Sequence, residues 1–437
     1  MALSKDFSER RPYNAVTDFV DANVERGLGN KIAFIDPDRS LTYGHLQARS
    51  VRFANALRNL GVEQEQRVAL LLNDTVDYPV AFWGTIRSGA VVIPLNTYLT
   101  VPQHAYILAD CRATALIAAA SLADTILPII DSLPQLKTVI LVGDTGGKFI
   151  GRNVHQFEDV IAGADTTPFT ADTLSDEVAF WLYTSGSTGD AKGVKHVHSN
   201  LMATASLFGQ GILRICEDDV VHSASKLFFA YGLGNAMTFP MSVGATAALW
   251  PHRPSPEGVF EMMRRHRPTI FYGVPSLYAA LLSHHGICKG AGSDRLRICV
   301  SAGEALPAHI GERWRDTVGV DVLDGLGSTE LLQTFLSNRP GDIRYGSTEM
   351  FQTFLSNRPG DVRYGTTGKR VPGYDLKIVD EQGREAAADE IGELVARGPT
   401  AGEGYWNQRA KSRHTFAGEW TYTGDKFSRD ADGYYHY

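Results

Sequence analysis

The stretch Tyr183–Lys195 reads YTSGSTGDAKGVK and directly follows the apolar run Val178–Leu182, VAFWL. A short apolar and aromatic run predicts a buried strand, and the glycines and hydroxyl side chains after it predict a loop at the end of a sheet. Glycines let the backbone approach an anion with its N–H groups turned inward, and Lys192 adds a positive charge. The stretch therefore predicts a strand followed by a phosphate-binding loop.

This loop differs from a Walker loop, because Lys192 precedes Gly193 rather than a serine or threonine. A flexible surface linker of Gly, Ser and Thr is the structural alternative. The strand before the loop and the lysines after it favour phosphate binding. The residues expected to contact the nucleotide here are Thr184, Ser185, Gly186, Ser187, Thr188, Gly189 and Lys192.

Outward from this loop, apolar runs alternate with helical patterns in both directions. Before it, strands are expected at 67–72, 90–95, 115–119 and 138–142, and after it at 220–223, 245–249, 270–272, 297–301 and 320–326. This alternation predicts two doubly wound α/β subdomains with parallel sheets. Short β runs with turn signals beyond 362 predict a small β-barrel-like subdomain. The expected domain boundaries are 1–174, 175–345 and 346–437.

Composition sets the outer bounds of the function. The chain has 437 residues, 43% of them hydrophobic, and carries a net charge of −7. A net acidic chain argues against nucleic acid as the main partner. No run of about 18 apolar residues occurs, which argues against a membrane span. Four widely spaced cysteines without CxxC spacing predict mostly buried, reduced thiols in a cytoplasmic protein.

A tandem duplication interrupts the second half of the chain. Gly327–Tyr345 is followed at once by Gly346–Tyr364, and these 19-residue copies differ at only three positions. Two copies are too few for a solenoid. Because the expected strand 320–326 leads directly into the first copy, we favour the first copy as the functional one. The additional residues are then expected to form a surface bulge, since loop closure costs grow slowly with length.

The loop sequence resembles the phosphate-loop signature of the adenylate-forming superfamily, which contains acyl- and aryl-CoA synthetases, peptide-synthetase adenylation domains and luciferases. Ala191 stands where that family usually has proline. Three more stretches resemble family motifs in the family's order: Ser301–Pro307, Gly327–Glu330 and Trp420–Asp425. The resemblance implies ATP-dependent activation of a carboxylic acid, with coenzyme A as co-substrate and Mg²⁺ beside the phosphates.

The resemblance also implies roles for single residues. Glu330 resembles the family's Mg²⁺ ligand and Thr329 its α-phosphate contact, so that both, with Lys192, are the expected catalytic residues. Without this context, Glu330 would be read as a solvated charge. The residues expected around the adenosine, by the same resemblance, are Gly303, Glu304, Ala305, Asp324 and Asp425.

The acid pocket resembles that of benzoate and hydroxybenzoate CoA ligases. Lys226–Asn235, KLFFAYGLGN, would supply a flat aromatic slot, although an aromatic cluster is usually only core. The residues expected to line this slot are Phe229, Ala230, Tyr231, Ala302, Gly327, Gln333 and Thr334. The last two are polar, and we interpret them as contacts for a ring hydroxyl group.

In the family a hinge and a C-terminal lid domain carrying a lysine follow this point, whereas the sequence given ends at Tyr437. We therefore expect the isolated chain to bind ATP and a small aromatic carboxylic acid but to turn over poorly. Two alternatives stay open, a nucleotide- and acid-binding fragment and adenylation for an acyl carrier protein. A homodimer is also left open.

Overall fold

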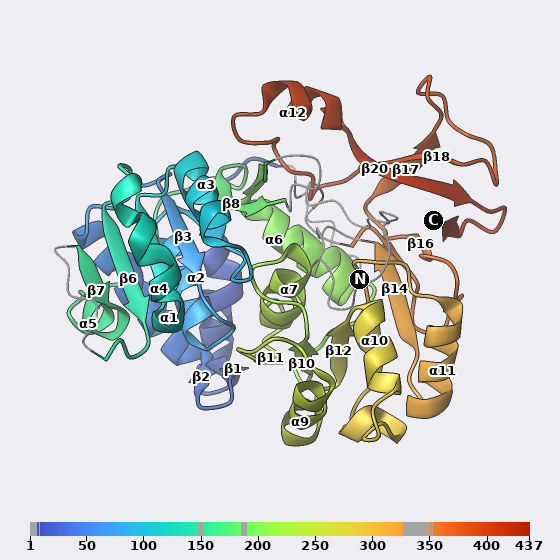
Figure 1. Cartoon of the computed structure of the whole chain (residues 1–437), viewed down its shortest axis with the longest axis horizontal. Helices are drawn as coiled ribbons and strands as arrows, with labels where there is room; N and C mark the ends of the chain where they lie inside the picture. The colour runs from blue at the N-terminus through green and yellow to red at the C-terminus, as the bar shows by residue number, and fades with distance from the viewer. Residues whose placement is uncertain (1–6, 8, 147–152, 185–189, 327–349, 351–352) are drawn as a thin grey trace. The chain divides into compact units, whose positions relative to one another are not determined.

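The computed structural model describes residues 7, 9–146, 153–184, 190–326, 350 and 353–437. The chain divides into two compact units. The first contains residues 1–183 and 195–202, and the second contains residues 184–194 and 203–437. Each unit is built around its own sheet (Figure 1).

The first unit has a sheet in the order β7-β6-β5-β3-β4-β8-β9. Its central pairs β3·β4, β3·β5 and β5·β6 are parallel. The strands are β3 (Arg67–Leu71), β4 (Val91–Pro94), β5 (Ala115–Ala119), β6 (Thr138–Val142), β7 (Val154–Gln156), β8 (Val178–Tyr183) and β9 (Gly193–Val197). Their side chains are almost continuously buried, as expected when helices cover both faces of a parallel sheet. The sequence predictions for this sheet are confirmed.

Helices of the first unit begin at recognisable signals. The Thr42 side chain caps α1 by accepting a hydrogen bond from the His45 N–H, and Thr100 forms a capping box with Gln103 at the start of α3. The helices are α1 (Tyr43–Asn59), α2 (Asp77–Arg87), α3 (Val101–Cys111), α4 (Ala123–Ile126) and α5 (Phe157–Ala162). An antiparallel hairpin is formed by β1 (Ile32–Ile35) and β2 (Ser40–Thr42).

The second unit contains seven neighbouring strands of another sheet, in the order β16-β15-β14-β13-β12-β10-β11. The pairs from β11 to β14 are parallel, whereas β14·β15 and β15·β16 are antiparallel. The strands are β10 (Val220–Ser223), β11 (Thr246–Ala248), β12 (Ile270–Gly273), β13 (Ile298–Ser301), β14 (Val322–Leu326), β15 (Leu355–Ser356) and β16 (Lys369–Arg370). The parallel strands end at one edge, where α/β sheets bind ligands.

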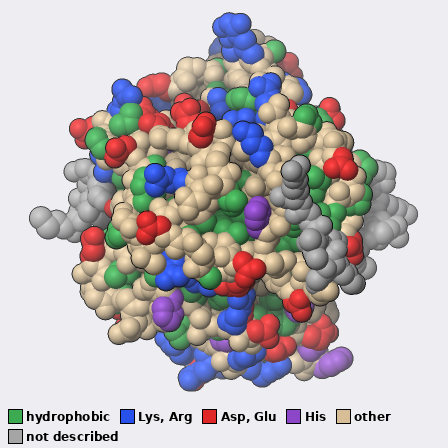
Figure 2. Space-filling model, turned by 90° about the vertical axis from the view of Figure 1, so that its left-hand side faces the viewer, with side chains coloured by type: hydrophobic (Ala, Val, Ile, Leu, Met, Phe, Trp, Pro, Cys, Tyr) green, Lys and Arg blue, Asp and Glu red, His purple; other side chains and the backbone are tan. Residues whose placement is uncertain are grey.

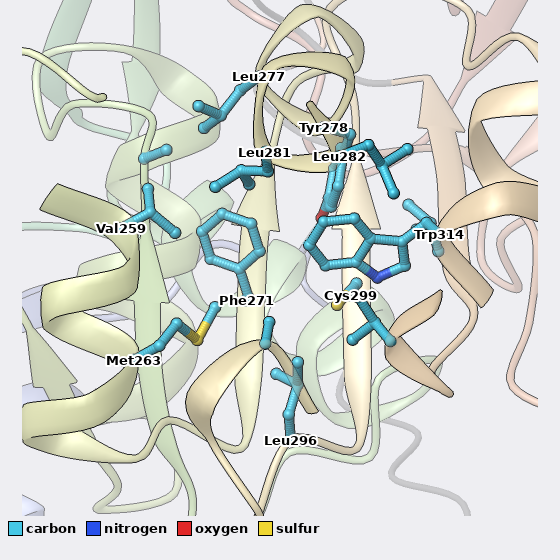
Figure 3. Packing of buried hydrophobic residues seen from close by; sticks show 14 of the residues in the cluster. Val259, Met263, Phe271, Leu277, Tyr278, Leu281, Leu282, Leu296, Cys299 and Trp314 are labelled. Atoms are coloured by element: carbon cyan, nitrogen blue, oxygen red, sulfur yellow. The ribbon is translucent and has the colours of Figure 1, made fainter. Parts of the chain in front are cut away.

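Three helices lie beside these strands in Figure 1: α9 (Pro256–His266), α10 (Pro275–Leu282) and α11 (Ala308–Val318). Figure 3 shows how they pack. Trp314 of α11 is fully buried, and its ring meets Tyr278 of α10 edge-on, with centroids 4.8 Å apart. Phe271 of β12 packs against the other side of Tyr278 at 5.7 Å. This aromatic core fixes the two helices against β12 and β13.

Shorter helices connect the sheet strands: α6 (His198–Thr204), α7 (Ala230–Leu233) and α8 (Phe239–Met241). The predicted small β subdomain is a five-stranded sheet with the order β17-β18-β20-β19, and β21 pairs with β20. Its strands are β17 (Asp375–Val379), β18 (Gly392–Arg397), β19 (Phe416–Ala417), β20 (Trp420–Arg429) and β21 (Tyr435–His436), and α12 (Arg409–Thr415) precedes β19. The pairs β17·β18, β18·β20, β19·β20 and β20·β21 are antiparallel.

The second copy of the duplication differs from the expectation. Met350, Phe354 and Leu355 are fully buried, and β15 belongs to this copy. The expectation of a surface bulge is therefore wrong for the described residues of the second copy. Local sequence could not decide this, because the two copies are nearly identical; the pairing partner on β14 decides it.

The surface mixes charge types. Figure 2 shows basic and acidic side chains on the same face, with hydrophobic atoms between them. Among the described residues, no helix is both long and apolar enough to cross a bilayer. All four cysteines are free, but Cys216 and Cys288 are exposed, so the expectation of mostly buried thiols holds only for Cys111 and Cys299.

Candidate active site

The base of the predicted phosphate loop is closed by two hydrogen bonds. The Thr184 N–H donates to the Lys192 carbonyl oxygen at 2.9 Å, and the Lys192 N–H donates to the Thr184 hydroxyl oxygen at 3.1 Å. Thr184 is buried, which fixes the point where the chain leaves β8. The five residues between Thr184 and Asp190 lie outside the described part of the chain, so the contacts predicted for them stay predictions.

The Lys192 side chain is positioned by an aromatic residue that the sequence interpretation missed. Its ammonium group lies 4.4 Å from the centroid of the Tyr405 ring. Two backbone contacts hold the Tyr405 segment here. One is a β-bridge between Val194 and Tyr405, and the other is a hydrogen bond of 2.8 Å from the Trp406 N–H to the Gly193 carbonyl oxygen. A cation over a tyrosine face is stabilised by the ring quadrupole. Because these residues are far apart in sequence, no local pattern could have paired them.

A cavity of about 570 Å³ lies at the carboxyl ends of β13 and β14. It brings together three residues that were predicted for the adenosine, namely Glu304, Ala305 and Asp324. The sequence interpretation missed four other residues that line this cavity, Gly365, Thr366, Thr367 and Tyr437. A volume in this range is typical of small-molecule sites.

Asp324 dominates the electrostatics of this cavity. Its side chain is buried, and burial raises the pKa of the carboxyl group to about 8, although the backbone N–H groups of Leu306 and Gly325 oppose this rise. Its Oδ1 atom has no hydrogen-bond partner among the described residues. Burial also raises the pKa of half-buried Glu304. At neutral pH the Asp324 carboxyl group is therefore protonated, and it can donate as well as accept a hydrogen bond.

The turn that carries Glu304 depends on one glycine. Gly303 has φ of +91°, a conformation that side-chain-bearing residues rarely adopt. It follows Ala302, which is buried immediately after β13. The turn therefore points Glu304 and Ala305 into the cavity, as the resemblance implied for an adenine-side loop.

The predicted acid slot lies around the start of α7. Tyr231 is buried, and its hydroxyl group donates to the Val300 carbonyl oxygen at 3.2 Å, two residues before Ala302. Burial raises the pKa of Tyr231 well above its usual range. Ala230 is buried, and Phe229 is half-buried with its ring 4.5 Å from that of Phe228. The structure thus ties Tyr231 to β13, the strand that directly precedes Ala302.

Close packing maintains this slot. A Cβ atom on Gly232 would lie 2.0 Å from the Lys226 carbonyl oxygen, so the segment between them folds back too tightly for any other residue. The Lys226 side chain donates to the Trp250 carbonyl oxygen. This buried lysine therefore has a structural role in the loop.

Asp425, the predicted ribose contact, is buried on β20. Its backbone N–H donates to the Thr423 hydroxyl oxygen at 3.2 Å, and Gly424 between them has φ of +79°. Asp425 is not among the residues that line the cavity of Asp324.

The remaining site predictions fall outside the described residues. They are Ser185, Gly186, Ser187, Thr188, Gly189, Gly327, Thr329, Glu330, Gln333 and Thr334. Within the described ranges, no group of three His, Cys, Asp or Glu side chains is arranged to hold a metal ion. The expected metal ligand, Glu330, thus stays a prediction.

A parallel sheet with a cavity at the carboxyl ends of β13 and β14 is the arrangement with which α/β proteins bind small molecules. Residues 20–406 match the model of the AMP-binding enzyme family. The chain belongs to this family.

Two relatives are similar over almost the entire chain. A 4-hydroxybenzoate–CoA/benzoate–CoA ligase of Rhodopseudomonas palustris is 48% identical over 98% of this chain and 75% of its own length. A benzoate–CoA ligase of Thauera aromatica is 44% identical over 97% of this chain and 76% of its own. The crystal structure of a benzoate CoA ligase from Burkholderia xenovorans LB400 matches with a TM-score of 0.87 at 42% identity, covering 97% of this chain and 79% of that one.

Proposed function

We propose that this chain is an aryl acid–CoA ligase of the AMP-forming type, acting on benzoate or 4-hydroxybenzoate. The observation that carries the proposal is the 44–48% identity to ligases of these acids over nearly the whole chain. An aromatic segment at the start of α7, hydrogen-bonded to Val300 of β13, supports an aromatic rather than an aliphatic acid.

The reaction has two steps. A carboxylate oxygen of the acid attacks the α-phosphorus of ATP, and the bond to the β-phosphate oxygen breaks, giving aryl-AMP and pyrophosphate. The thiol of coenzyme A then loses its proton and attacks the carbonyl carbon, which releases AMP and leaves the thioester. Positioning and stabilisation of negative charge dominate such chemistry.

Several residues that the structure describes would bind the phosphates, the adenine ring and the aryl ring. Lys192, held over the Tyr405 ring, is placed beside the loop that we propose cradles the phosphates. The cavity of Glu304, Ala305 and Asp324 would take the adenine ring. Because Asp324 is protonated at neutral pH, its hydroxyl group can donate to a ring nitrogen while its other oxygen accepts. Tyr231, Ala230 and Phe229 would hold the aryl ring.

Three further elements belong to the proposal. Mg²⁺ would neutralise part of the phosphate charge when bound, with Glu330 as its ligand. Thr329 would contact the α-phosphate, and Asp425 the ribose. We also propose that the enzyme acts in the cytoplasm and place no constraint on whether it forms a homodimer.

The test is an acid panel. The purified chain, ATP, Mg²⁺ and coenzyme A are incubated with benzoate, 4-hydroxybenzoate or hexadecanoate, and AMP and thioester are measured by chromatography. We expect AMP and thioester with the aromatic acids only. A preference for hexadecanoate, or AMP release that does not depend on any acid, would contradict the proposal. Transfer to a carrier protein but not to coenzyme A would favour the carrier alternative.

A further inference from the structure

Helix α12 (Arg409–Thr415) is strongly basic, although the protein as a whole is acidic. It carries Arg409, Lys411 and Arg413, which we call the α12 cations, and all three are exposed. The stretch 404–418 around them contains no aspartate and no glutamate. Three positive charges are therefore concentrated on one short helix of a chain whose net charge is −7. Such a surface attracts anions.

The α12 cations are not neutralised by the side chains that the structure describes. Elsewhere in the same β subdomain an exposed arginine is paired, since Arg397 contacts Asp375 at 2.6 Å and Glu419 at 2.8 Å. By contrast, no described carboxylate lies within 4.0 Å of an α12 cation. Arg409 and Arg413 are four residues apart, a spacing that places like charges side by side on a helix and destabilises it. An anion bound beside them would relieve this repulsion.

Hydrogen bonds attach α12 to Tyr405, the residue whose ring lies under Lys192. The Tyr405 N–H donates to the Ser412 hydroxyl oxygen at 3.0 Å, and the Tyr405 hydroxyl group donates to the Thr415 hydroxyl oxygen at 3.4 Å. The Tyr405 ring also meets the Phe416 ring, with centroids 5.5 Å apart. Because the Lys192 ammonium group lies 4.4 Å from the centroid of the same tyrosine ring, Tyr405 connects the base of the phosphate loop to α12.

The same contacts set which side chains of α12 face outward. The Ser412 hydroxyl group also donates to the Gln408 carbonyl oxygen at 2.9 Å. Ser412 and Thr415 are half-buried, whereas the α12 cations are exposed. The helix is thus attached through its small polar side chains and presents its charged side chains to solvent.

The proposed function supplies two polyanionic ligands, and their chemistry distinguishes them. The α-phosphorus of ATP reacts, so the phosphate groups of ATP must lie inside the site together with the acid. The reacting thiol of coenzyme A is separated from its diphosphate and 3′-phosphate groups by a long, flexible pantetheine arm. The thiol can therefore reach the aryl-AMP while the phosphate groups stay at the protein surface. Exposed cations attached to the base of the phosphate loop suit this charged end of coenzyme A.

We propose that the α12 cations bind the charged end of coenzyme A, with the 3′-phosphate as their main contact. This proposal rests on the proposed function, in which coenzyme A accepts the aryl group. The 3′-phosphate is a terminal phosphate group that can accept hydrogen bonds from several donors. Arginine binds such a group through two parallel N–H donors, and lysine adds a point charge. The α12 cations then contribute to the affinity for coenzyme A and not to adenylation.

The variant that tests this assignment removes all three charges and keeps the side chains polar. The substitutions are made at exposed positions and leave the core untouched; they are Arg409→Gln, Lys411→Gln and Arg413→Gln, combined in one chain. A matched control removes three exposed cations from other elements by combining Lys137→Gln, Arg264→Gln and Lys289→Gln. Both variants change the net charge by the same amount, and their Tm values are compared with that of the unsubstituted chain. Should the triple variant not fold, Lys411→Gln alone is compared with Lys289→Gln alone.

Calorimetry then measures the Kd values of coenzyme A and 3′-dephospho-coenzyme A, with the chain saturated by the stable adenylate analogue 5′-O-(N-benzoylsulfamoyl)adenosine. ATP is titrated separately, without the analogue. Loss of the α12 cations should weaken the binding of coenzyme A about tenfold, as expected for charge-assisted hydrogen bonds that solvent partly screens. The Kd of 3′-dephospho-coenzyme A should change much less, and that of ATP should not change. The control variant should bind all three ligands like the unsubstituted chain.

Several results would overturn the proposal. They are unchanged affinity of the α12 variant for coenzyme A, an equal loss in the control variant, an equal loss for 3′-dephospho-coenzyme A, or a loss of affinity for ATP alone. If the unsubstituted chain binds ATP and the adenylate analogue but not coenzyme A, the proposal is also overturned, while adenylation of an aryl acid still stands. If the unsubstituted chain binds neither ATP nor the analogue, the proposed function itself is contradicted and this proposal falls with it.

Discussion

The buried carboxyl group of Asp324 makes the stability of the protein depend on pH in a defined window. Burial raises its pKa from 3.8 in the unfolded chain to about 8 in the folded one. Between these values the folded state binds one proton that the unfolded state does not, so stability falls as pH rises. The stability that the protonated Asp324 carboxyl group contributes is fully present below its pKa in the unfolded chain. It is lost as pH rises through its pKa in the folded chain.

The size of the effect follows from the same two values. Proton linkage changes the free energy of unfolding by at most about 1.4 kcal/mol for each pH unit. Because the proton is already partly lost near pH 8, the expected fall between pH 6 and pH 8 is about 2 kcal/mol. Asp324→Asn keeps the shape of the protonated side chain but cannot ionise, so this part of the pH dependence should vanish.

Urea unfolding of both proteins at pH 6, 7 and 8, followed by circular dichroism, measures the difference. The exposed carboxylate of Glu312, replaced by glutamine, serves as a control that should retain the full pH dependence. If Asp324→Asn shows the same fall between pH 6 and pH 8 as the unsubstituted chain, the reasoning about this buried carboxyl group is refuted.

Three other predictions concern the loop lysine, a buried histidine and the core. Tyr405→Leu should weaken ATP binding severalfold, as expected for loss of about 0.5–2 kcal/mol of cation–π attraction, whereas Tyr405→Phe should bind ATP normally; equal loss in both would contradict a role for the ring. Burial lowers the pKa of His222 to about 4, so the stability contributed by its neutral imidazole is present above pH 6.5 and is lost as pH falls towards 4. His222→Asn cannot take up this proton. In a pH series of Tm, it should therefore unfold less readily than the unsubstituted chain on acidification over this range. Trp314→Ala should cost about 3–5 kcal/mol in urea unfolding while Glu312→Ala on the same helix costs little, and a small effect at Trp314 would contradict its place in the core.

Much of the fold could be predicted because its signals are local. The run Val178–Leu182 predicted β8, since buried parallel strands are often apolar along their whole length, and 320–326 predicted β14 by its place in the alternation of strands and helices. The loop at Gly303 was expected from the resemblance of Ser301–Pro307 to a family motif. These features depend on few neighbours in the sequence.

The remaining features depend on contacts between distant segments. Nothing near Tyr405 indicates that its ring lies under Lys192, and nothing near Thr366 indicates that it lines the same cavity as Asp324. The duplication is the sharpest case. Its two copies have nearly the same local preferences, so only the pairing of Leu355 with Leu326 distinguishes them, and the sequence-based preference for the first copy was an argument about strand entry alone.

The most direct test of the proposed chemistry follows one oxygen atom. Benzoate labelled with ¹⁸O in its carboxylate group is incubated with ATP, Mg²⁺, coenzyme A and the chain at stoichiometric concentration, and the products are analysed by mass spectrometry. Attack of the carboxylate on the α-phosphorus predicts one ¹⁸O atom in AMP and none in pyrophosphate. Unlabelled AMP, or label in inorganic phosphate, would contradict adenylation as the central reaction of this protein.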